Sequence, residues 1–550
     1  MLLYKRKWRY SMLLALLLVG LLAGIQLKDK YFKFSKNLEI FATILKELDS
    51  HYVDEVDTEA LVKTGIDAML RSLDPYTTFF SEEDLESLEV SITGEYGGIG
   101  AIIGSREGKA IIFMLFKDQP AHKGGLHAGD KIIQINGEDV VDSSHDHIVK
   151  LIKGMPGTSV QLSVIRDGVA QPLAFTLNRE QVTMKNVPYY GQLQQHIGYI
   201  KLASFTPHAA DEVKAALASI KEKGAEKLIL DLRGNAGGIL EEAIRVANLL
   251  IAQNLTVVTT KGKAATLIRS HTTTQPAYDK TMPVIVLIDQ TSASAAEIVA
   301  GVIQDYDRGV LIGKSTFGKG LVQSVTPLHY NTQLKLTTAK YYIPSGRCIQ
   351  KINHSLHRQE KVTEEDVDKP VFMTQAGRRV YESNGIAPDI EVEELLRLAP
   401  ITVSLIANNL IFDYATRFQA QHARIQPARE FRLSDSQYEQ FLAWLQDKDY
   451  AYTIENSLDQ LLKKAEEESY TEDIKKQIAS LKAQVQCHKK EELQKFKSEI
   501  KRILQQTIVA RYYFQEGAIA VTLEHDKAIQ KACALFQDMA QYYTHLKVAE

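Results

Sequence analysis

The stretch PVIVLIDQTSASAAEIVAGVIQDY, residues 283–306, decides the fold of the central part of the chain. Its first six residues form a short apolar run, which predicts a buried strand. A turn follows over residues 290–293, and an alanine-rich segment that begins at Ser294 then predicts a helix. A buried strand that leads through a short turn into a helix is the repeating unit of a layered α/β domain.

The same alternation continues on both sides of this stretch and predicts an α/β domain over residues 183–398 with a buried sheet. Apolar runs predict strands at 197–200, 227–232 and 310–312, and helical spacing of apolar residues predicts helices at 209–223 and 239–251.

Ser294 is the candidate nucleophile of the quoted stretch, because a serine at a strand-to-helix turn holds its hydroxyl at the mouth of the sheet. The unpaired amides of the helix's first turn lie close by, and they could stabilise an oxyanion. Ser292 is a competing candidate. A structural role also stays open, since Ser294 and Glu297 have the spacing of a capping box.

A second segment, GKSTFGKG at residues 313–320, follows the strand at 310–312. It nearly fits a phosphate-binding loop, but Gly320 stands where Ser or Thr should bind magnesium, and a strand pattern follows instead of a helix. We therefore do not expect nucleotide binding. Lys319, between two glycines and near Phe317, could instead be a poorly solvated, neutral general base, with Gln323 hydrogen-bonded to its amine.

A third segment, DLRGNAGG at residues 231–238, also lies between a predicted strand and a predicted helix. Its glycines allow close approach of the backbone and leave amides free. A tight turn with an Asn cap is an equally good interpretation of this segment alone.

The rest of the chain divides into three regions that differ in their pattern of apolar, glycine and charged residues. Residues 31–88 show helical spacing and predict a small N-terminal helical domain, and residues 89–182 hold short β-rich runs separated by Gly and Asp turns. Residues 399–550 are charged and predict a C-terminal helical domain. Its apolar stripe could serve a partner or lid function, although docking onto its own core is the simpler interpretation.

Composition limits the function further. The net charge of −3 over 550 residues favours no interaction with nucleic acid, and three scattered cysteines indicate neither a disulfide framework nor a zinc site. The first 30 residues carry basic residues ahead of an apolar run from Met12 to Ile25, which predicts export. The run is short for a membrane span but lacks a clear cleavage site, so both a cleaved signal peptide and an uncleaved membrane anchor remain possible.

Taken in order, these segments resemble the carboxyl-terminal processing (tail-specific) proteases. The resemblance spans about Leu38 to Asp389 and rests on an ordered set of motifs: residues 73–76, 97–100, 231–238, 291–297 and 316–320, with Gln323. It implies that Ser294 is the nucleophile and Lys319 the base, assisted by Gln323, with backbone amides of Gly237 or Gly238 and Ala295 as oxyanion donors. The chain departs from the family at Ala236 and Ala296, which replace no catalytic side chain.

The resemblance also implies that residues 89–182 form a PDZ domain and that 183–398 form a crotonase-like protease core. The segment Gly97, Gly98, Ile99 and Gly100 would be the loop whose amides capture a peptide carboxylate. A helix over residues 145–152 would line an apolar pocket for the peptide's last side chain.

The sequence therefore predicts an exported, periplasmic, secreted or inner-membrane-anchored multidomain α/β serine endopeptidase that requires no cofactor or metal. Its expected partners are polypeptides with exposed C-termini, with an adaptor as a further possibility. The rival hypothesis is a non-catalytic PDZ adaptor on a protease-like scaffold.

Overall fold

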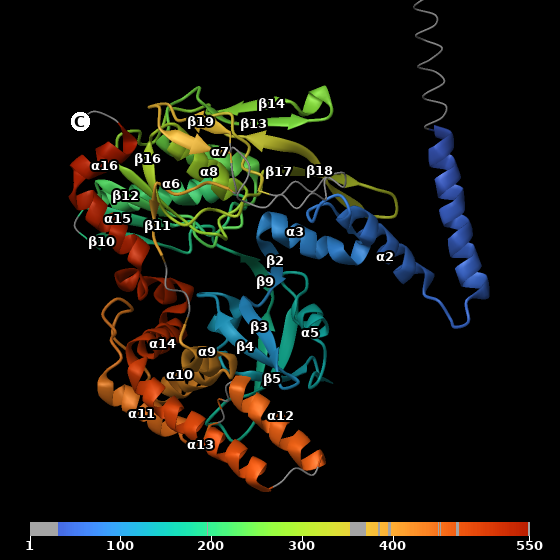
Figure 1. Cartoon of the computed structure of the whole chain (residues 1–550), viewed down its shortest axis with the longest axis vertical. Helices are drawn as coiled ribbons and strands as arrows, with labels where there is room; N and C mark the ends of the chain where they lie inside the picture. Colours follow the sequence, from blue (N-terminus) through green and yellow to red (C-terminus); the bar gives the residue numbers. More distant parts are fainter. Residues whose placement is uncertain are drawn as a thin grey trace, which may run out of the picture. The chain divides into compact units, whose positions relative to one another are not determined.

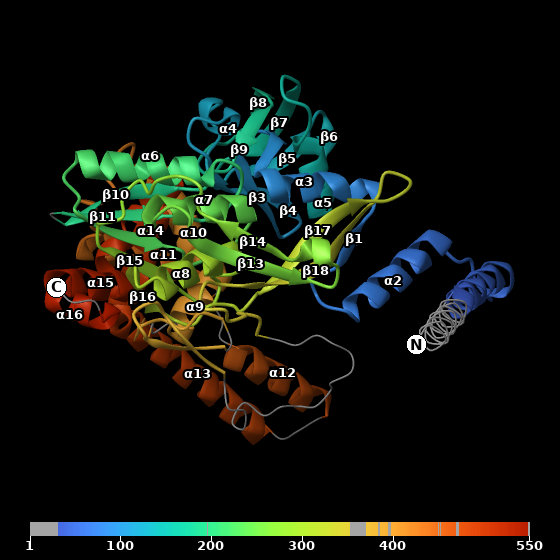
Figure 2. The same ribbon diagram turned by 90° about the horizontal axis from the view of Figure 1, so that it is seen from above.

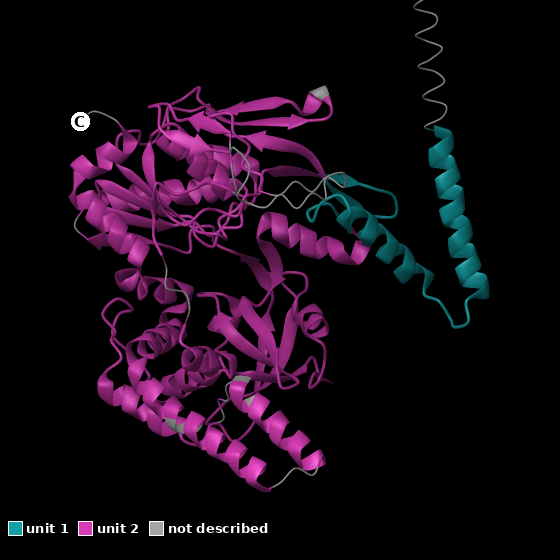
Figure 3. Cartoon of the chain, in the orientation of Figure 1, with its two compact units in different colours: residues 1–79, 325–336, 354–359 teal, residues 80–324, 337–353, 360–550 magenta. Residues whose placement is uncertain are grey.

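A computed structural model describes residues 31–194, 196–351, 370–382, 385–393, 398–448, 450, 453–468 and 472–547. Residues 1–30, the predicted signal peptide or anchor, lie outside this range. Within the described part, no helix is both long and apolar enough to span a membrane. The chain forms two compact units, coloured in Figure 3.

The smaller unit contains, among described residues, 31–79 and 325–336. A helix over residues 31–51 is followed by α2 (Thr58–Arg71), whose N-cap Asp57 accepts the Ala60 amide at 3.0 Å. After α2, the buried Asp74 accepts the amides of Tyr76 and Thr77, each at 2.8 Å. These bonds form a tight turn after α2.

The larger unit begins with η1 (Glu82–Asp84) and α3 (Leu85–Thr93), which lead into a β-rich domain (Figure 1). Its sheet has the order β3–β4–β5–β7–β8, with β6 paired to β5, so that β3 is an edge strand. Its strands are β3 (Ala101–Arg106), β4 (Lys109–Leu115), β5 (Lys131–Ile135), β6 (Glu138–Asp139), β7 (Ser159–Ile165) and β8 (Leu173–Asn178). Helices α4 (Pro120–Lys123) and α5 (His145–Ile152) belong to this domain, and β2 (Glu95–Gly98) pairs with β9 (Glu180–Thr183).

The α/β core is built on a second sheet of order β10–β11–β12–β15–β16–β21, parallel except for the pair β10–β11. Its strands are β10 (Tyr189–Gln194), β11 (Ile197–Lys201), β12 (Lys227–Asp231), β15 (Val284–Ile288), β16 (Gly309–Gly313) and β21 (Ile390–Glu391). Strands β12, β15 and β16 are almost wholly buried, as expected for a parallel sheet covered on both faces.

Helices α6 (Ala209–Glu222), α7 (Leu240–Leu250) and α8 (Ala295–Asp305) pack on one face of this sheet and form the largest apolar core. A smaller sheet beside it contains β13 (Thr256–Gly262), β14 (Arg269–Thr272), β17 (Leu321–Pro327) and β18 (Gln333–Tyr342). β19 (Val371–Met373) and β20 (Arg379–Tyr381) form a separate antiparallel pair.

The C-terminal region is helical, as the sequence predicts. Its elements are α9 (Pro400–Ala407), α10 (Leu410–Gln421), α11 (Asp435–Leu445), α12 (Thr453–Glu467), α13 (Glu472–Lys495), α14 (Lys497–Ala520), α15 (Lys527–Gln537) and α16 (Met539–Leu546). Residues of α9, α10, α11 and α14 share an apolar core of their own. By contrast, α15 and α16 lie beside β16 in both Figure 1 and Figure 2, and they pack on the second face of the α/β sheet.

Candidate active site

The three segments singled out in the sequence emerge at one edge of the α/β sheet. Strands β12, β15 and β16 are parallel neighbours, with Asp231 opposite Leu287 and Ile288 opposite Gly313. Each segment directly follows the carboxyl end of one of these strands. Carboxyl ends of parallel strands are where open α/β sheets bind ligands, so the fold gathers the candidate residues where a site is expected.

Ser294 occupies a strained turn between β15 and α8. Its dihedral angles are φ 56° and ψ −116°, whereas an ordinary N-cap residue has extended angles. A positive φ is costly for a residue with a Cβ, and such strain concentrates at functional positions. A nucleophile presented on a sharp strand-to-helix turn has this kind of geometry.

Ser292, the competing serine, has a structural environment. Its side chain is fully buried, and its hydroxyl donates to the carbonyl oxygen of Leu232 at 2.9 Å. The Asp289 amide donates in turn to Ser292 Oγ at 3.0 Å. The hydroxyl of Ser292 therefore joins the loops that follow β12 and β15, whereas Ser294 is only partly buried.

Glu297 connects the Ser294 turn with the Lys319 segment. Its buried carboxylate accepts the amides of Ser294 at 2.7 Å, Gly318 at 2.8 Å and Lys319 at 2.9 Å. It also accepts the hydroxyl of Thr316 at 2.6 Å. The local pattern around Glu297 predicts only a capping role, because nothing in it points to residues about 20 positions later. One carboxylate thus holds the backbones of the candidate nucleophile and the candidate base together.

Burial raises the pKa of Glu297 to about 7, and the hydrogen bonds from Thr316, Lys319, Ser294 and Gly318 oppose this rise. A carboxylate with four donors around it is the form that satisfies them all, whereas a protonated carboxyl would place a fifth hydrogen among them. The ionisation state of Glu297 is therefore coupled to the geometry of the site.

Lys319 lies partly buried between Gly318 and Gly320. Both glycines are required by close packing: a Cβ on Gly318 would lie 2.6 Å from Lys351 Cβ, and one on Gly320 would lie 2.8 Å from the Gln350 amide. The Phe317 side chain is 48% exposed, so it provides less burial around Lys319 than the sequence suggests.

Gln323 lies on β17, four residues after Lys319. Its side-chain amide donates to the hydroxyl of Thr337 on β18 at 3.2 Å. This bond directs the nitrogen of the side-chain amide toward β18 and leaves the carbonyl oxygen of the same amide as an acceptor for other groups.

The glycine loop after β12 touches the Ser294 turn. Gly237 has φ +100°, and a Cβ on it would lie 2.8 Å from Ser294 Cβ and 3.0 Å from the Ala295 nitrogen. The Gly237 amide itself donates to Asn235 Oδ1 at 2.8 Å. The amides of Gly238 and Ala295 donate no hydrogen bond within the described residues, which makes these two the available donors among the three that the sequence proposes.

Asp231 anchors the start of this loop. It is buried, accepts the Tyr199 hydroxyl at 2.8 Å, and pairs with Arg233 at 2.7 Å and Lys201 at 3.2 Å. Although burial alone would raise its pKa, Arg233 and Lys201 hold the pKa of Asp231 well below its usual value. Asp231 is therefore an ionised structural carboxylate at neutral pH.

Comparison with known protein families finds three matches along the chain. Residues 196–358 match the model of peptidase family S41, residues 87–165 that of the PDZ domain, and residues 401–536 that of a probable PDZ-protease C-terminal helical domain. The carboxy-terminal-processing protease of Bartonella bacilliformis is 36% identical over 58% of this chain and 73% of its own length.

Carboxy-terminal processing protease CtpA of Bacillus subtilis is 32% identical over 64% of this chain and 73% of its own length. This chain belongs to the carboxy-terminal processing proteases. The predicted family and multidomain α/β fold are thereby confirmed. Among solved structures, the photosystem II D1 C-terminal processing protease is 24% identical and covers 64% of this chain and 92% of its own, with a TM-score of 0.35.

The predicted carboxylate-binding segment of the PDZ domain is only partly a loop. Gly97 and Gly98 lie in β2, paired with Gln181 and Glu180 of β9, whereas Ile99 and Gly100 lie between β2 and β3. The amides of Ile99 and Gly100 donate no hydrogen bond within the described part of the chain. The protease therefore holds two free donors beside the open edge of β3.

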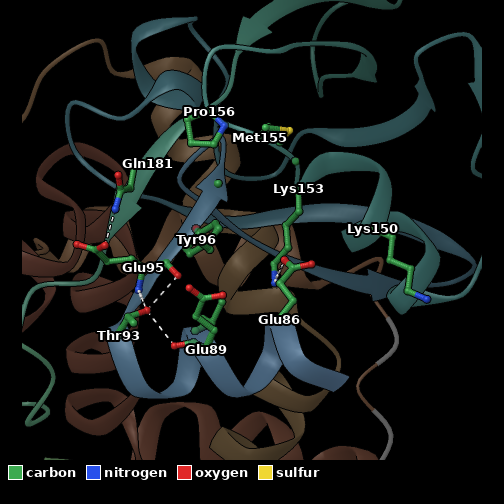
Figure 4. Close-up of a pocket in the computed structure, with 13 residues that line it drawn as sticks. Glu86, Glu89, Thr93, Glu95, Tyr96, Lys150, Lys153, Met155, Pro156 and Gln181 are labelled. Atoms are coloured by element: carbon green, nitrogen blue, oxygen red, sulfur yellow. Dashed lines mark hydrogen bonds and ion pairs between the residues drawn. The ribbon is translucent and has the colours of Figure 1, made fainter. Parts of the chain in front are cut away.

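A cavity of about 490 Å³ adjoins this segment at Gly97 (Figure 4). Its walls carry charges of both signs, including an ion pair between Glu86 and Lys153 at 3.2 Å. The Glu95 carboxylate, also on the wall, accepts the side-chain amide of Gln181. This lining differs from the apolar pocket that the sequence predicts for the last peptide side chain.

Proposed function

We propose that this protease is exported, binds the free carboxyl terminus of a polypeptide at its PDZ domain, and cleaves the polypeptide through a Ser294–Lys319 mechanism. The observation that carries the proposal is the strained Ser294 turn, which the Glu297 carboxylate ties to the Lys319 backbone. The turn also lies against Gly237. The candidate nucleophile, the candidate base and the candidate oxyanion donors thus lie at one edge of the sheet.

In this mechanism the neutral amine of Lys319 takes the proton of Ser294 Oγ as the oxygen attacks the scissile carbonyl carbon. The resulting ammonium then gives that proton to the leaving amine, and the C–N bond breaks to leave an acyl-enzyme. Water, deprotonated by the same lysine, hydrolyses the ester and regenerates Ser294. Gln323 would orient Lys319 with the carbonyl oxygen that its bond to Thr337 leaves available.

The negative oxygen of the tetrahedral intermediate would accept the amides of Ala295 and Gly238. Both amides are without an acceptor among the described residues. The Ala295 amide also lies at the N-terminus of α8, where the helix dipole is positive. The Gly237 amide, bonded to Asn235, would have to leave that acceptor before it could contribute.

Tail recognition would use the edge of the PDZ sheet. A peptide could add as a strand beside β3, with its carboxylate at the amides of Ile99 and Gly100 and its side chains toward α5. Because the anion supplies the recognition, a tailed substrate peptide with a carboxamide end should show a KM at least about tenfold higher than the same peptide with a free carboxylate.

A serine-reactive fluorophosphonate probe tests the catalytic assignment. We expect it to label the wild type and Ser292→Ala but not Ser294→Ala, and Lys319→Ala should lose turnover while it still binds a tailed peptide. Ser292→Ala is the matched control, because it removes a neighbouring hydroxyl with a structural bond. Labelling of Ser294→Ala at the wild-type rate would refute the assignment, and an unlabelled wild type would favour the PDZ adaptor hypothesis.

Export is supported by the sequence alone, through the basic residues and apolar run within residues 1–30. Fusing these residues to alkaline phosphatase, which folds to an active enzyme only outside the cytoplasm, should give phosphatase activity. An inactive fusion would contradict export. Whether the active fusion stays in the membrane fraction or becomes soluble separates an anchor from a cleaved signal.

A further inference from the structure

Helices α15 and α16, at the end of the chain, cover the second face of the protease sheet. Side chains of Ile529, Phe536 and Tyr542 form one buried core with Tyr199 and Ile285 of the sheet. The hydroxyl of Tyr542 also accepts the amide of Val284 at 3.0 Å, at the start of the strand that leads to Ser294. These helices are therefore a structural layer of the protease core, although they follow the separate helical core of the C-terminal region.

This layer contacts the glycine loop through one carboxylate. Asp526, the N-cap of α15, accepts the Ile529 amide at 3.0 Å and forms an ion pair with Arg233 at 2.8 Å. Arg233 is nearly buried, and its other guanidinium nitrogens bind Asp231. The guanidinium thus lies between two carboxylates, one from the strand before the loop and one from the C-terminal helix.

The position of Arg233 matters because it immediately precedes Gly234. The Gly234 amide is held by Asp289 and Thr291 of the Ser294 turn, at 3.2 and 3.0 Å. Four residues on, Gly238 carries one of the free amides. A change in the Arg233 side chain would therefore act on a short, tightly connected segment that ends at the candidate oxyanion donor.

We infer that Asp526 is a positioning residue for catalysis: it fixes Arg233, and through Arg233 the loop that carries the Gly238 amide. This gives the end of the C-terminal helical region a role in the protease reaction. The inference rests on the proposed function of that loop. It predicts that loss of the charge at residue 526 lowers the rate of acylation and leaves tail binding unchanged.

Asp526→Asn tests the role of the ion pair with Arg233 while the helix cap is retained. Asn caps helices as well as Asp does, but it has no negative charge to pair with the guanidinium. We expect kcat for a tailed peptide, and the rate of fluorophosphonate labelling of Ser294, to fall about tenfold, while KM changes less than twofold. Glu524→Gln is the matched control. Glu524 lies two residues before Asp526 but pairs with the exposed Arg432, so the Glu524→Gln substitution should leave both rates unchanged.

Asp526→Ser, which also keeps a cap, guards against an effect peculiar to Asn. Rates are referred to the fraction of folded protein from the thermal melt of each variant. Unchanged labelling rates in both variants would overturn the inference, as would an equal loss in Glu524→Gln. A wild type that neither cleaves the peptide nor reacts with the probe would instead overturn the proposed function, so that the two failures are distinguishable.

Discussion

At the scale of the residue, the carboxylate of Glu297 links the two segments of the candidate active site. Glu297 lies one turn into α8, yet its acceptors serve both the helix start and a segment that arrives from the next strand. The backbones of Ser294 and Lys319 are consequently held relative to each other. This does not depend on the conformation of the flexible lysine side chain.

Replacing this carboxylate by an amide should be disruptive. In Glu297→Gln one of the two oxygens becomes an NH₂ group that faces hydrogen-bond donors, so at least one buried amide or hydroxyl loses its acceptor. We expect the free energy of unfolding to fall by about 2–4 kcal/mol and cleavage to become at least tenfold slower. Urea unfolding and steady-state kinetics measure both. Unchanged stability would mean that the four bonds are dispensable.

The pH dependence of stability provides a second test of Glu297. Its pKa of about 7 in the folded state lies above the ordinary value of 4.5, so between these values the folded protein binds a proton that the unfolded chain does not. Its contribution to stability is thus full below pH 4.5 and is lost as the pH rises to 7, with a slope of up to about 1.4 kcal/mol per unit.

Glu297→Gln lacks this titration and serves as the reference. The difference in unfolding free energy between wild type and variant should shrink from pH 5 to pH 7 and level off above it. A difference that stays constant across this window would show that the carboxyl of the folded protein is ionised throughout it.

At the scale of the element, three parallel strands deliver the site. Because β12, β15 and β16 are neighbours, the loops that follow them meet without any long insertion. The contact is so close that Gly237 has no room for a side chain beside Ser294.

Gly237→Ala should therefore displace Ser294. We expect at least a hundredfold loss of kcat with tail binding retained, since the added methyl group would lie 2.8 Å from both Ser294 Cβ and the Ala293 oxygen. Gly234→Ala is the control: its φ of +73° is also positive, but no atom beyond its chain neighbours lies within 4 Å of the added Cβ. Equal losses in both variants would attribute the effect to strain alone.

Strand and helix positions in this core follow from sequence because periodicity and turn residues are local properties. The strand before Ser294 and the helix over 209–223 are found where the sequence predicts them. Ser292 could not be separated from Ser294 by the residues alone, since the distinction depends on the Leu232 carbonyl 60 positions away. The role of Glu297 was missed for the same reason.

At the scale of the whole molecule, the C-terminal region has two kinds of contact that its charged, helical sequence does not reveal. Its last helices, α15 and α16, cover the second face of the protease sheet, while α10 and α14 pack against the PDZ domain. Phe412 of α10 lies 5.0 Å from Phe113 between ring centroids, and Phe514 of α14 packs on the PDZ core with a positive φ of 55°. Amphipathic spacing shows that a helix has an apolar face but cannot name the surface that covers it.

The bond between Arg106 of the PDZ edge strand and Asp413 of α10 is the clearest polar part of this interface. Two nitrogen–oxygen distances of 2.8 and 3.0 Å join a guanidinium and a carboxylate that are both about a quarter exposed. A double-mutant cycle with Arg106→Ala and Asp413→Ala should give a coupling of about 0.5–1 kcal/mol in urea unfolding, reduced at high salt. The same cycle with Glu107, which is exposed and 3.6 Å from Arg106, should give almost none. Equal coupling in both cycles would mean that Arg106 responds to the general charge of its surroundings, and that the PDZ domain is not held to α10 through this pair.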